Sequence, residues 1–325
     1  MMIDGLQCGY FTRDVFSILK EGGFTCVTGT LGFWEGSQAS LDAIGRWRRL
    51  ARANEDLMLI ARTADDIARA HESARIAVLL GFQNSTLFDG RIDYVELFAD
   101  LGVRVVQLTY NNQNEAGGSC YEEHDNGLTR FGREMVREMN RVGILVDLSH
   151  VGENTTFDAI EWSRKPVAIS HANAQSLFPH KRNKSDRVLK ALAERGGVIG
   201  CATYRNITPE AACATVRSWC EMVARTVDIA GIDHVAIGTD EGHGNTQVDL
   251  DWMRSGYWTR DVDYGAGSAA RPGKVPKPDW LPRTSELARV GDGLIEVGFS
   301  EAERDQILAG NWLRVYRDVF RTDIV

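Results

Sequence analysis

The chain has 325 residues, of which 43% are hydrophobic and 25% are charged. This composition is typical of a folded globular protein and excludes disordered and collagen-like classes. Its 45 acidic and 37 basic residues give a formal net charge of −8, which disfavours general attraction to nucleic acid or to an anionic membrane. We therefore expect a small-molecule substrate, and neither a nucleic-acid nor a membrane partner.

Six cysteines are scattered along the chain without a CxxC pair, so neither a zinc ribbon nor a disulfide framework is predicted. The first residues enter patterned sequence directly, without the segments of a signal peptide, and no apolar run approaches the ~20 residues that span a bilayer. We expect reduced thiols and a cytoplasmic location.

Short apolar runs alternate with segments of helical spacing. The runs are 2–6, 24–28, 76–83, 103–110, 144–150, 167–171, 197–203 and 234–240, and the helical segments are 13–21, 40–54, 63–73, 93–101, 129–142, 155–163, 185–195 and 215–230. Near-continuous apolar strands that alternate with helices are typical of a parallel sheet covered on both faces. Eight such units predict a (β/α)₈ TIM barrel, as a single domain over residues 1–325. A Rossmann fold is disfavoured because the Gly-rich turn after the first strand is missing.

Two later segments extend this barrel. Residues 261–283 are rich in glycine and proline, which predicts a long ordered loop after the eighth strand. Residues 300–320 have helical spacing and predict a C-terminal helical extension that docks on the barrel.

The candidate site follows from the strand ends, because TIM barrels place their active sites at the C-terminal face. His150 and His171 end consecutive strands, so we expect their imidazoles to converge as metal ligands do. A single histidine at a strand end is more often a satisfied polar residue, but the pair favours a site. Asp240 ends the last strand and is expected to act as a further ligand or as a general base.

Other residues near the strand ends have two interpretations each. The polar stretches 110–114 and 117–121 either recognise the polar groups of a substrate or form a solvated loop. An aromatic wall with an acidic residue would suit a methylated ammonium group, although simple packing is the favoured interpretation. The residues concerned are Trp34, Glu35, Trp252, Tyr257 and Trp258.

These strand ends and their flanking sequence resemble the membrane (renal) dipeptidase family of zinc metallopeptidases, which belongs among the amidohydrolase-like barrels. The matching stretches follow the family's order over essentially the whole chain. They are residues 127–133, 138–140, 146–150 (Val146-Asp147-Leu148-Ser149-His150), 166–171, 182–186 (Arg182-Asn183-Lys184-Ser185-Asp186), 196–198, 237–240 (Ile237-Gly238-Thr239-Asp240) and 310–315.

The resemblance implies zinc-dependent hydrolysis of dipeptides, with two metal ions bridged by a glutamate and a hydroxide. His150 and His171 match the histidines that hold the second metal, and Asp240 matches the aspartate of the eighth strand. Arg182 matches the arginine expected to clasp the carboxylate of the substrate, and Tyr204 matches a tyrosine that contacts the substrate. The resemblance also implies a homodimer.

The chain departs from the family pattern at four positions. The His-x-Asp pair of the first metal is replaced by Leu6 and Cys8, the bridging glutamate by Gln83, and the histidine that helps polarise the scissile carbonyl by Tyr110. Leucine ligates nothing, and a neutral amide neither bridges two cations nor offsets their charge. We therefore expect the first metal to be absent.

The remaining metal is expected to be one zinc ion held by His150 and His171, with Gln83, Asp240 or water completing its ligands. A site whose ligands are neutral is weaker than one that contains a carboxylate, so we expect partial or even lost occupancy by the metal.

The sequence thus predicts a mononuclear, dipeptidase-like hydrolase that cleaves an amide-type bond in a small carboxylate-bearing substrate, with Arg182, Tyr204 and Tyr110 as substrate-binding residues. Two alternatives stay open. One is a lyase, decarboxylase or isomerase that uses the same metal site, and the other is a non-catalytic descendant that binds a small molecule.

Overall fold

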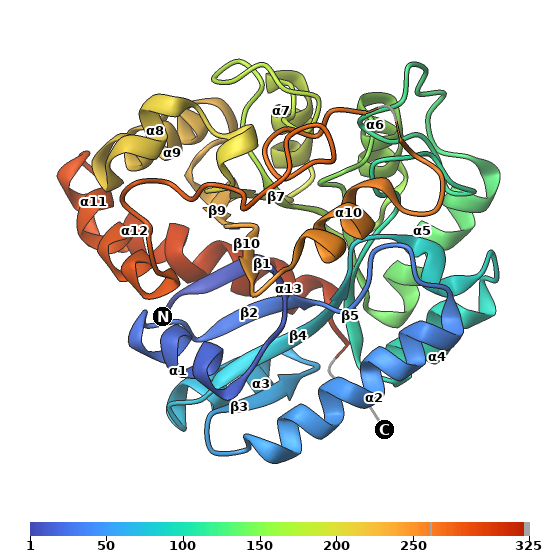
Figure 1. Cartoon of the computed structure of the whole chain (residues 1–325), viewed down its shortest axis with the longest axis horizontal. Helices are drawn as coiled ribbons and strands as arrows, with labels where there is room; N and C mark the ends of the chain where they lie inside the picture. Colours follow the sequence, from blue (N-terminus) through green and yellow to red (C-terminus); the bar gives the residue numbers. More distant parts are fainter. Residues whose placement is uncertain (261, 322–325) are drawn as a thin grey trace.

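The strands of the computed structural model, which describes residues 1–260 and 262–321, pair in parallel throughout one curled sheet. Their order is β10-β1-β2-β4-β5-β6-β7-β8-β9, and β3 pairs with β4 outside this path. Figure 1 shows the strands at the centre with the helices around them. The strands are β1 Ile3–Gly9, β2 Cys26–Thr30, β3 Met58–Ala61, β4 Ile76–Phe82, β5 Val103–Gln107, β6 Leu145–Asp147, β7 Ala168–Ala172, β8 Val198–Cys201, β9 Val235–Ile237 and β10 Glu241–His243.

The eight predicted strands are confirmed, and the fold is a (β/α)₈ barrel. The sequence does not predict β3 or β10. The eight predicted helices are also present. Five of them start after a hydroxyl side chain that accepts a backbone N–H, at Thr12, Thr63, Thr129, Ser185 and Thr215. The helices are α1 Arg13–Glu21, α2 Ser37–Ala53, α3 Ala64–Glu72, α4 Asp93–Asp100, α5 Arg130–Val142, α6 Glu153–Trp162, α7 Asp186–Glu194, α8 Glu210–Ala214, α9 Val216–Ala230, α10 Gln247–Ser255, α11 Val290–Glu296, α12 Glu301–Asp305 and α13 Asn311–Val319.

The eighth strand of the barrel is divided into two pieces. β9 pairs with β8, and β10, which begins four residues after the end of β9, pairs with β1 and so closes the barrel. The prediction of one strand over 234–240 is therefore wrong at its C-terminal end, where β9 stops at Ile237. Asp240 adopts a left-handed backbone conformation (φ 60°), which interrupts the strand. Asp4 in β1 supports the junction by accepting hydrogen bonds from the backbone N–H and the hydroxyl of Thr239, at 2.8 and 2.6 Å.

Glycines let the strands approach closely at the centre of the barrel. A Cβ atom on Gly5, Gly200 or Gly238 would lie 2.6, 2.2 or 1.8 Å from the carbonyl oxygen of Ser170. Only residues without a side chain fit there. The backbone of β7 around Ser170 is therefore held from several sides, which matters below because Ser170 contacts a histidine of the site.

The C-terminal segment forms the floor of the barrel, as predicted for residues 300–320. α12 and α13 are joined by a π-helical turn over Gln306–Gly310. Trp312 in α13 is 1% exposed and donates its indole N–H to the carbonyl oxygen of Ile237 in β9, at 2.8 Å. This end of the barrel is thus sealed, and the opposite end is open to ligands.

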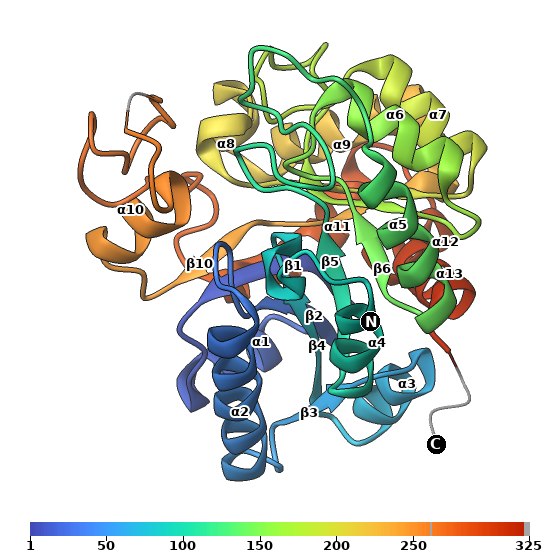
Figure 2. The same ribbon diagram turned by 90° about the vertical axis from the view of Figure 1, so that its right-hand side faces the viewer.

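The segment that follows β10 was only partly predicted. Residues 262–283 contain no helix or strand, in agreement with the predicted loop, whose first residue lies outside the described part. The sequence does not predict α10, which lies with this loop to one side of the barrel (Figure 2). Across the described residues, no helix combines the length and the apolar character that crossing a bilayer requires.

Candidate functional site

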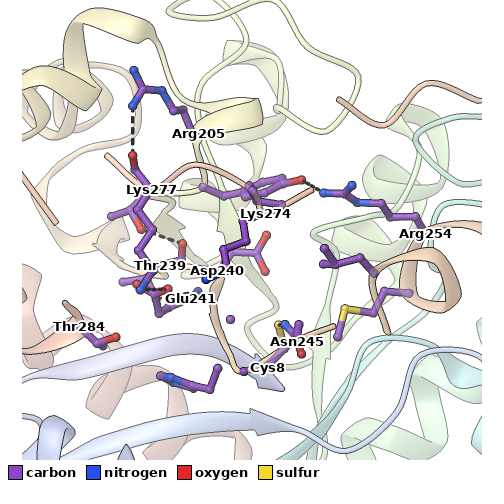
Figure 3. Close-up of a pocket in the computed structure, with 18 of the residues that line it drawn as sticks. Cys8, Arg205, Thr239, Asp240, Glu241, Asn245, Arg254, Lys274, Lys277 and Thr284 are labelled. Atoms are coloured by element: carbon purple, nitrogen blue, oxygen red, sulfur yellow. Dashed lines mark hydrogen bonds and ion pairs between the residues drawn. The ribbon is translucent and has the colours of Figure 1, made fainter. Parts of the chain in front are cut away.

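A pocket of about 650 Å³ opens at the C-terminal ends of the strands, the end predicted to carry the site. The structure brings six of the seven predicted site residues to its wall: Gln83, Tyr110, His150, Arg182, Tyr204 and Asp240. The seventh, His171, is fully buried behind His150. Figure 3 shows part of the wall, including Asp240, Cys8 and Arg254.

The two predicted metal ligands face each other. His150 follows β6, and His171 lies in β7, the neighbouring strand. Their Nε2 atoms are 3.1 Å apart, and both side chains are more than nine-tenths buried. The expected convergence of the imidazoles is thus present, and the chemistry depends on which nitrogen of each ring carries the proton.

The tautomer of His150 is set by Asn111. The Nδ1 atom of His150 lies 2.8 Å from the Oδ1 atom of Asn111. An amide oxygen only accepts hydrogen bonds, so Nδ1 carries the proton and donates it. The orientation of the Asn111 amide is consistent with this, because its Nδ2 faces the carbonyl oxygen of Arg254 at 3.4 Å. The Nε2 atom of His150 therefore presents a lone pair.

The tautomer of His171 is set by a serine held on a buried carboxylate. Ser170 Oγ donates its proton to Asp147 Oδ2 and lies 2.7 Å from His171 Nδ1. With its proton used on the carboxylate, the hydroxyl accepts from Nδ1–H. Asp147 is fixed in turn by Ser149, whose hydroxyl donates to Oδ1 at 2.7 Å. The Nε2 atom of His171 therefore also presents a lone pair.

Two lone pairs thus face each other at 3.1 Å without a proton between them. Burial lowers the pKa of both imidazoles well below the usual value, and the nearby cation of Arg182 lowers them further. At neutral pH a cation is the group that would stabilise this pair. Two Zn–N bonds of about 2.0–2.1 Å span such a separation at an N–Zn–N angle of about 100°, so one metal ion fits the two nitrogens. Outer hydrogen bonds that fix ligand tautomers are also typical of metal sites.

No third strong ligand joins the two histidines. Among residues 1–260 and 262–321, no group of three or more His, Cys, Asp or Glu side chains is placed to hold a metal ion. The amide of Gln83 is engaged on both sides: its Nε2 donates to Thr30 Oγ1 at 3.0 Å, and its Oε1 accepts from Gln107 Nε2 at 3.3 Å. The role of Gln83 as a ligand therefore stays a prediction.

The positions where the resemblance places the first metal carry a neutral cluster. Leu6 is buried, and burial raises the pKa of the Cys8 thiol, so that it stays protonated. Between them, Gln7 donates to Asp4 Oδ2 at 2.8 Å and accepts from His243 Nε2 at 2.9 Å. Leu6, Cys8 and Gln7 provide no anionic donor, so these residues do not fit a second metal ion.

Asp240 is the free carboxylate of the pocket. Its side chain is half-buried, and within the described residues it has no hydrogen-bond or ion-pair partner in the structure. Burial raises the pKa of its carboxyl to about 7, while Arg182 acts in the opposite direction. A carboxylate with a pKa near neutrality is suited to take and release a proton.

Arg182 is held by backbone carbonyl oxygens. It is 3% exposed, and its guanidinium donates to Ser149 O at 2.6 Å and to His171 O at 3.2 Å. No carboxylate within the described residues pairs with it. The backbone on both sides of the histidine pair therefore orients a cation whose remaining N–H groups are suited to an anion.

The aromatic residues near the pocket pack against one another. Tyr110 stacks on His150 with ring centroids 4.0 Å apart, and Trp34 meets Tyr110 edge-on at 5.5 Å. The Glu35 carboxylate accepts from the indole N–H of Trp252 at 2.8 Å and from the backbone N–H of Trp34 at 2.9 Å. Glu35 thus connects the loop after β2 to α10. This supports the interpretation that the aromatic residues pack together, rather than the interpretation that they bind a methylated ammonium group.

The comparisons with known proteins point to one family. Residues 19–253 match the model of the membrane dipeptidase family (peptidase family M19), which is more than half of the chain. The chain belongs to the membrane dipeptidase family. The match begins after the segment that contains Leu6 and Cys8, where this member departs from the family pattern.

Individual proteins are similar to this chain over much of its length. An uncharacterized dipeptidase of Schizosaccharomyces pombe is 34% identical over 62% of this chain and 50% of its own length. Dipeptidase 3 of Rattus norvegicus is 27% identical over 87% of this chain and 52% of its own. The chain thus spans about half the length of these curated relatives. The crystal structure of an amidohydrolase from Pseudomonas aeruginosa is 37% identical, with a TM-score of 0.93, over 98% of this chain and 96% of that one.

Sequence reasoning missed the residues that set the histidine tautomers, namely Asn111, Asp147 and Ser170, and it missed Arg254 of the pocket wall. One signal was present: each predicted ligand follows a serine, as Ser149-His150 and Ser170-His171. The Asn111 contact joins residues 39 positions apart, and no local pattern reveals it.

Proposed function

We propose that this member of the membrane dipeptidase family is a metal-dependent hydrolase that cleaves an amide-type bond in a small, carboxylate-bearing substrate with a single divalent metal ion, zinc in the first instance. The observation that carries the proposal is the pair of buried Nε2 lone pairs at 3.1 Å. The family match and the curated dipeptidase relatives support the reaction class.

His150 and His171 would hold the metal ion, each fixed by its Nδ1–H hydrogen bond. A divalent ion bound there supplies Lewis acidity, which polarises a carbonyl and makes water a better nucleophile at neutral pH. The protein contributes a preorganised environment, because the tautomers are set before any ligand arrives.

The other pocket residues bind substrate and move protons. Arg182 binds the substrate carboxylate with the N–H groups that its backbone contacts leave free. Asp240, without a partner and with a pKa near 7, accepts the proton of the attacking water and returns it to the leaving amine. Tyr110 covers one face of His150 and limits the access of solvent to that ring.

Tyr204 is oriented as a hydrogen-bond donor. Its hydroxyl oxygen accepts from Arg254 and from Asn206, each at 2.7 Å. With the oxygen used as an acceptor on that side, its proton is left for a group in the pocket. A carbonyl or carboxylate oxygen of the substrate is the group that it suits.

The test is turnover of dipeptides and N-acyl amino acids by zinc-loaded protein, with amine release as the readout and ¹⁸O-labelled water as the tracer. We expect one labelled oxygen in the product carboxylate and a loss of at least 100-fold in His150→Gln and in His171→Gln. The surface variant His124→Gln, whose side chain is exposed, is the matched control and keeps full activity. Product without label, or exchange of deuterium onto carbon, would identify a lyase or an isomerase instead; no turnover, with binding retained, would identify a binding protein.

A further inference from the structure

A second guanidinium lies in the pocket wall without an anionic partner. Arg254, in the last turn of α10, is 7% exposed and lines the same cavity as Arg182. One of its terminal nitrogens donates to Tyr204, and the other is buried without any hydrogen-bond partner. Figure 3 shows Arg254 with its single dashed contact. A buried cation without a counter-charge is unfavourable unless a ligand supplies one.

The four arginines of the pocket wall differ in their ion pairs. Arg205 forms ion pairs with Glu210 and Asp279, and Arg283 pairs with Glu21. Within the described residues, neither Arg182 nor Arg254 has such a pair. The protein, although its net charge is −8, therefore keeps in one cavity two buried cations that form no ion pair within the described residues.

A second donor beside Arg254 also lacks a partner. Tyr264 is 5% exposed, lines the pocket, and has a buried hydroxyl without a hydrogen bond. The guanidinium packs closely against Gly267, where a Cβ atom would lie 2.8 Å from the unpartnered nitrogen of Arg254, so a side chain at that position would displace it. Unsatisfied buried donors gathered at one wall are typical of a place that a ligand or water fills.

We propose that Arg254, together with the hydroxyl groups of Tyr204 and Tyr264, forms a second anion subsite that binds a second carboxylate of the substrate. The proposal rests on the proposed function and deepens it: the substrate class becomes a small amide with two carboxylates, one for Arg182 and one for Arg254. Both arginines line one cavity of about 650 Å³, so one small molecule can reach both. A guanidinium flanked by hydroxyl donors matches the planar fork of a carboxylate.

The subsite is tested by binding, with a matched pair of ligands that differ in one charge. N-acetylglutamate and N-acetylglutamine are titrated calorimetrically into zinc-loaded protein, with the aspartate and asparagine pair as a shorter version. We expect the diacid to bind about 10- to 100-fold more tightly than its monoamide. Arg254→Met should abolish this preference, because the diacid loses a charged partner and the monoamide loses only the contact of Arg254 with Tyr204. Arg205→Met, the matched control with a compensated charge, should keep it.

The melting temperature of Arg254 variants distinguishes an anion subsite from a structural role of this residue. Arg254→Met removes an uncompensated buried cation, so the ligand-free variant should melt at the same temperature as the parent protein or above it. Arg254→Lys keeps the charge but not the fork, and should retain only part of the preference. A lower melting temperature with equal loss of both ligands would show that Arg254 is structural and would overturn the proposal.

The failures of the two proposals are distinguishable. If the monoamide binds in an Arg182-dependent manner and the diacid binds no better, the second subsite is refuted and the proposed function stands. If none of the four ligands binds zinc-loaded protein, both proposals fail.

Discussion

Replacing Ser170 by alanine tests the tautomer argument, because the change removes the group that keeps the His171 proton on Nδ1. His171 is fully buried, so the Nδ1–H that now donates to Ser170 at 2.7 Å would lose its acceptor. An unsatisfied buried donor costs about 1–3 kcal/mol. The ring avoids this cost by moving its proton to Nε2, where it can donate to His150 across 3.1 Å.

A metal ion must then displace that proton before it binds. The same 1–3 kcal/mol corresponds to about a 5- to 150-fold weaker zinc affinity, which overlaps the 10- to 100-fold losses typical when such outer hydrogen bonds are removed. We expect the Kd of Ser170→Ala for zinc to rise within this range. The assay is competition with a chromogenic chelator at pH 7.5.

Ser119→Ala is the matched control. Ser119 donates to the backbone carbonyl of His150 at 2.7 Å, and that carbonyl also accepts from Cys120 N–H at 2.9 Å. The variant therefore loses a similar bond near the same residue without touching an imidazole, and its zinc affinity should change by less than about threefold. A folded Ser170→Ala protein that binds zinc as tightly as the parent would refute the reasoning.

Three further predictions concern the site and the barrel. Asp240→Asn should lower kcat by about 10²- to 10⁴-fold with zinc affinity retained, because Asp240 acts as the base; a lost zinc affinity would instead make it a ligand. Burial lowers the pKa of His243 to about 4, below the value of about 6.5 in the unfolded chain. The stability that the neutral imidazole contributes is therefore fully present above about pH 6.5 and is lost as the pH falls to about 4. This loss amounts to about 3 kcal/mol and should be absent in His243→Gln by urea denaturation; an equal loss in the variant would contradict the assignment. Trp312→Ala should destabilise the protein by about 3–5 kcal/mol in the same assay, since Trp312 is 1% exposed. A change below about 1 kcal/mol would argue against its role as the barrel floor.

The sequence predicts most of the barrel because its signals are local. Apolar runs and hydroxyl caps such as Thr63 and Thr129 act within a few residues of the elements they define. β10, by contrast, reads Glu241-Gly242-His243, and no apolar pattern marks it. It is a strand because its backbone pairs with β1, which is a property of the closed barrel.

The site also has a part that the sequence predicts and a part that it does not. The topology of a barrel alone places His150, His171 and Asp240 at one end, so their common location follows from strand order. The hydrogen-bond partners that give them their chemistry come from distant loops, as the contact between Asn111 and His150 shows. Arg254 lies in a helix that the sequence does not predict, and its lack of an anionic partner is visible only in the folded protein.

The central claim is that two neutral imidazoles with facing Nε2 lone pairs hold one metal ion. The most direct measurement is a crystal structure of zinc-loaded protein with anomalous diffraction recorded on both sides of the zinc edge. The account predicts one anomalous peak per chain, at about 2.0–2.1 Å from Nε2 of both His150 and His171. An anomalous peak bound elsewhere, or none at all with zinc in excess, would contradict it.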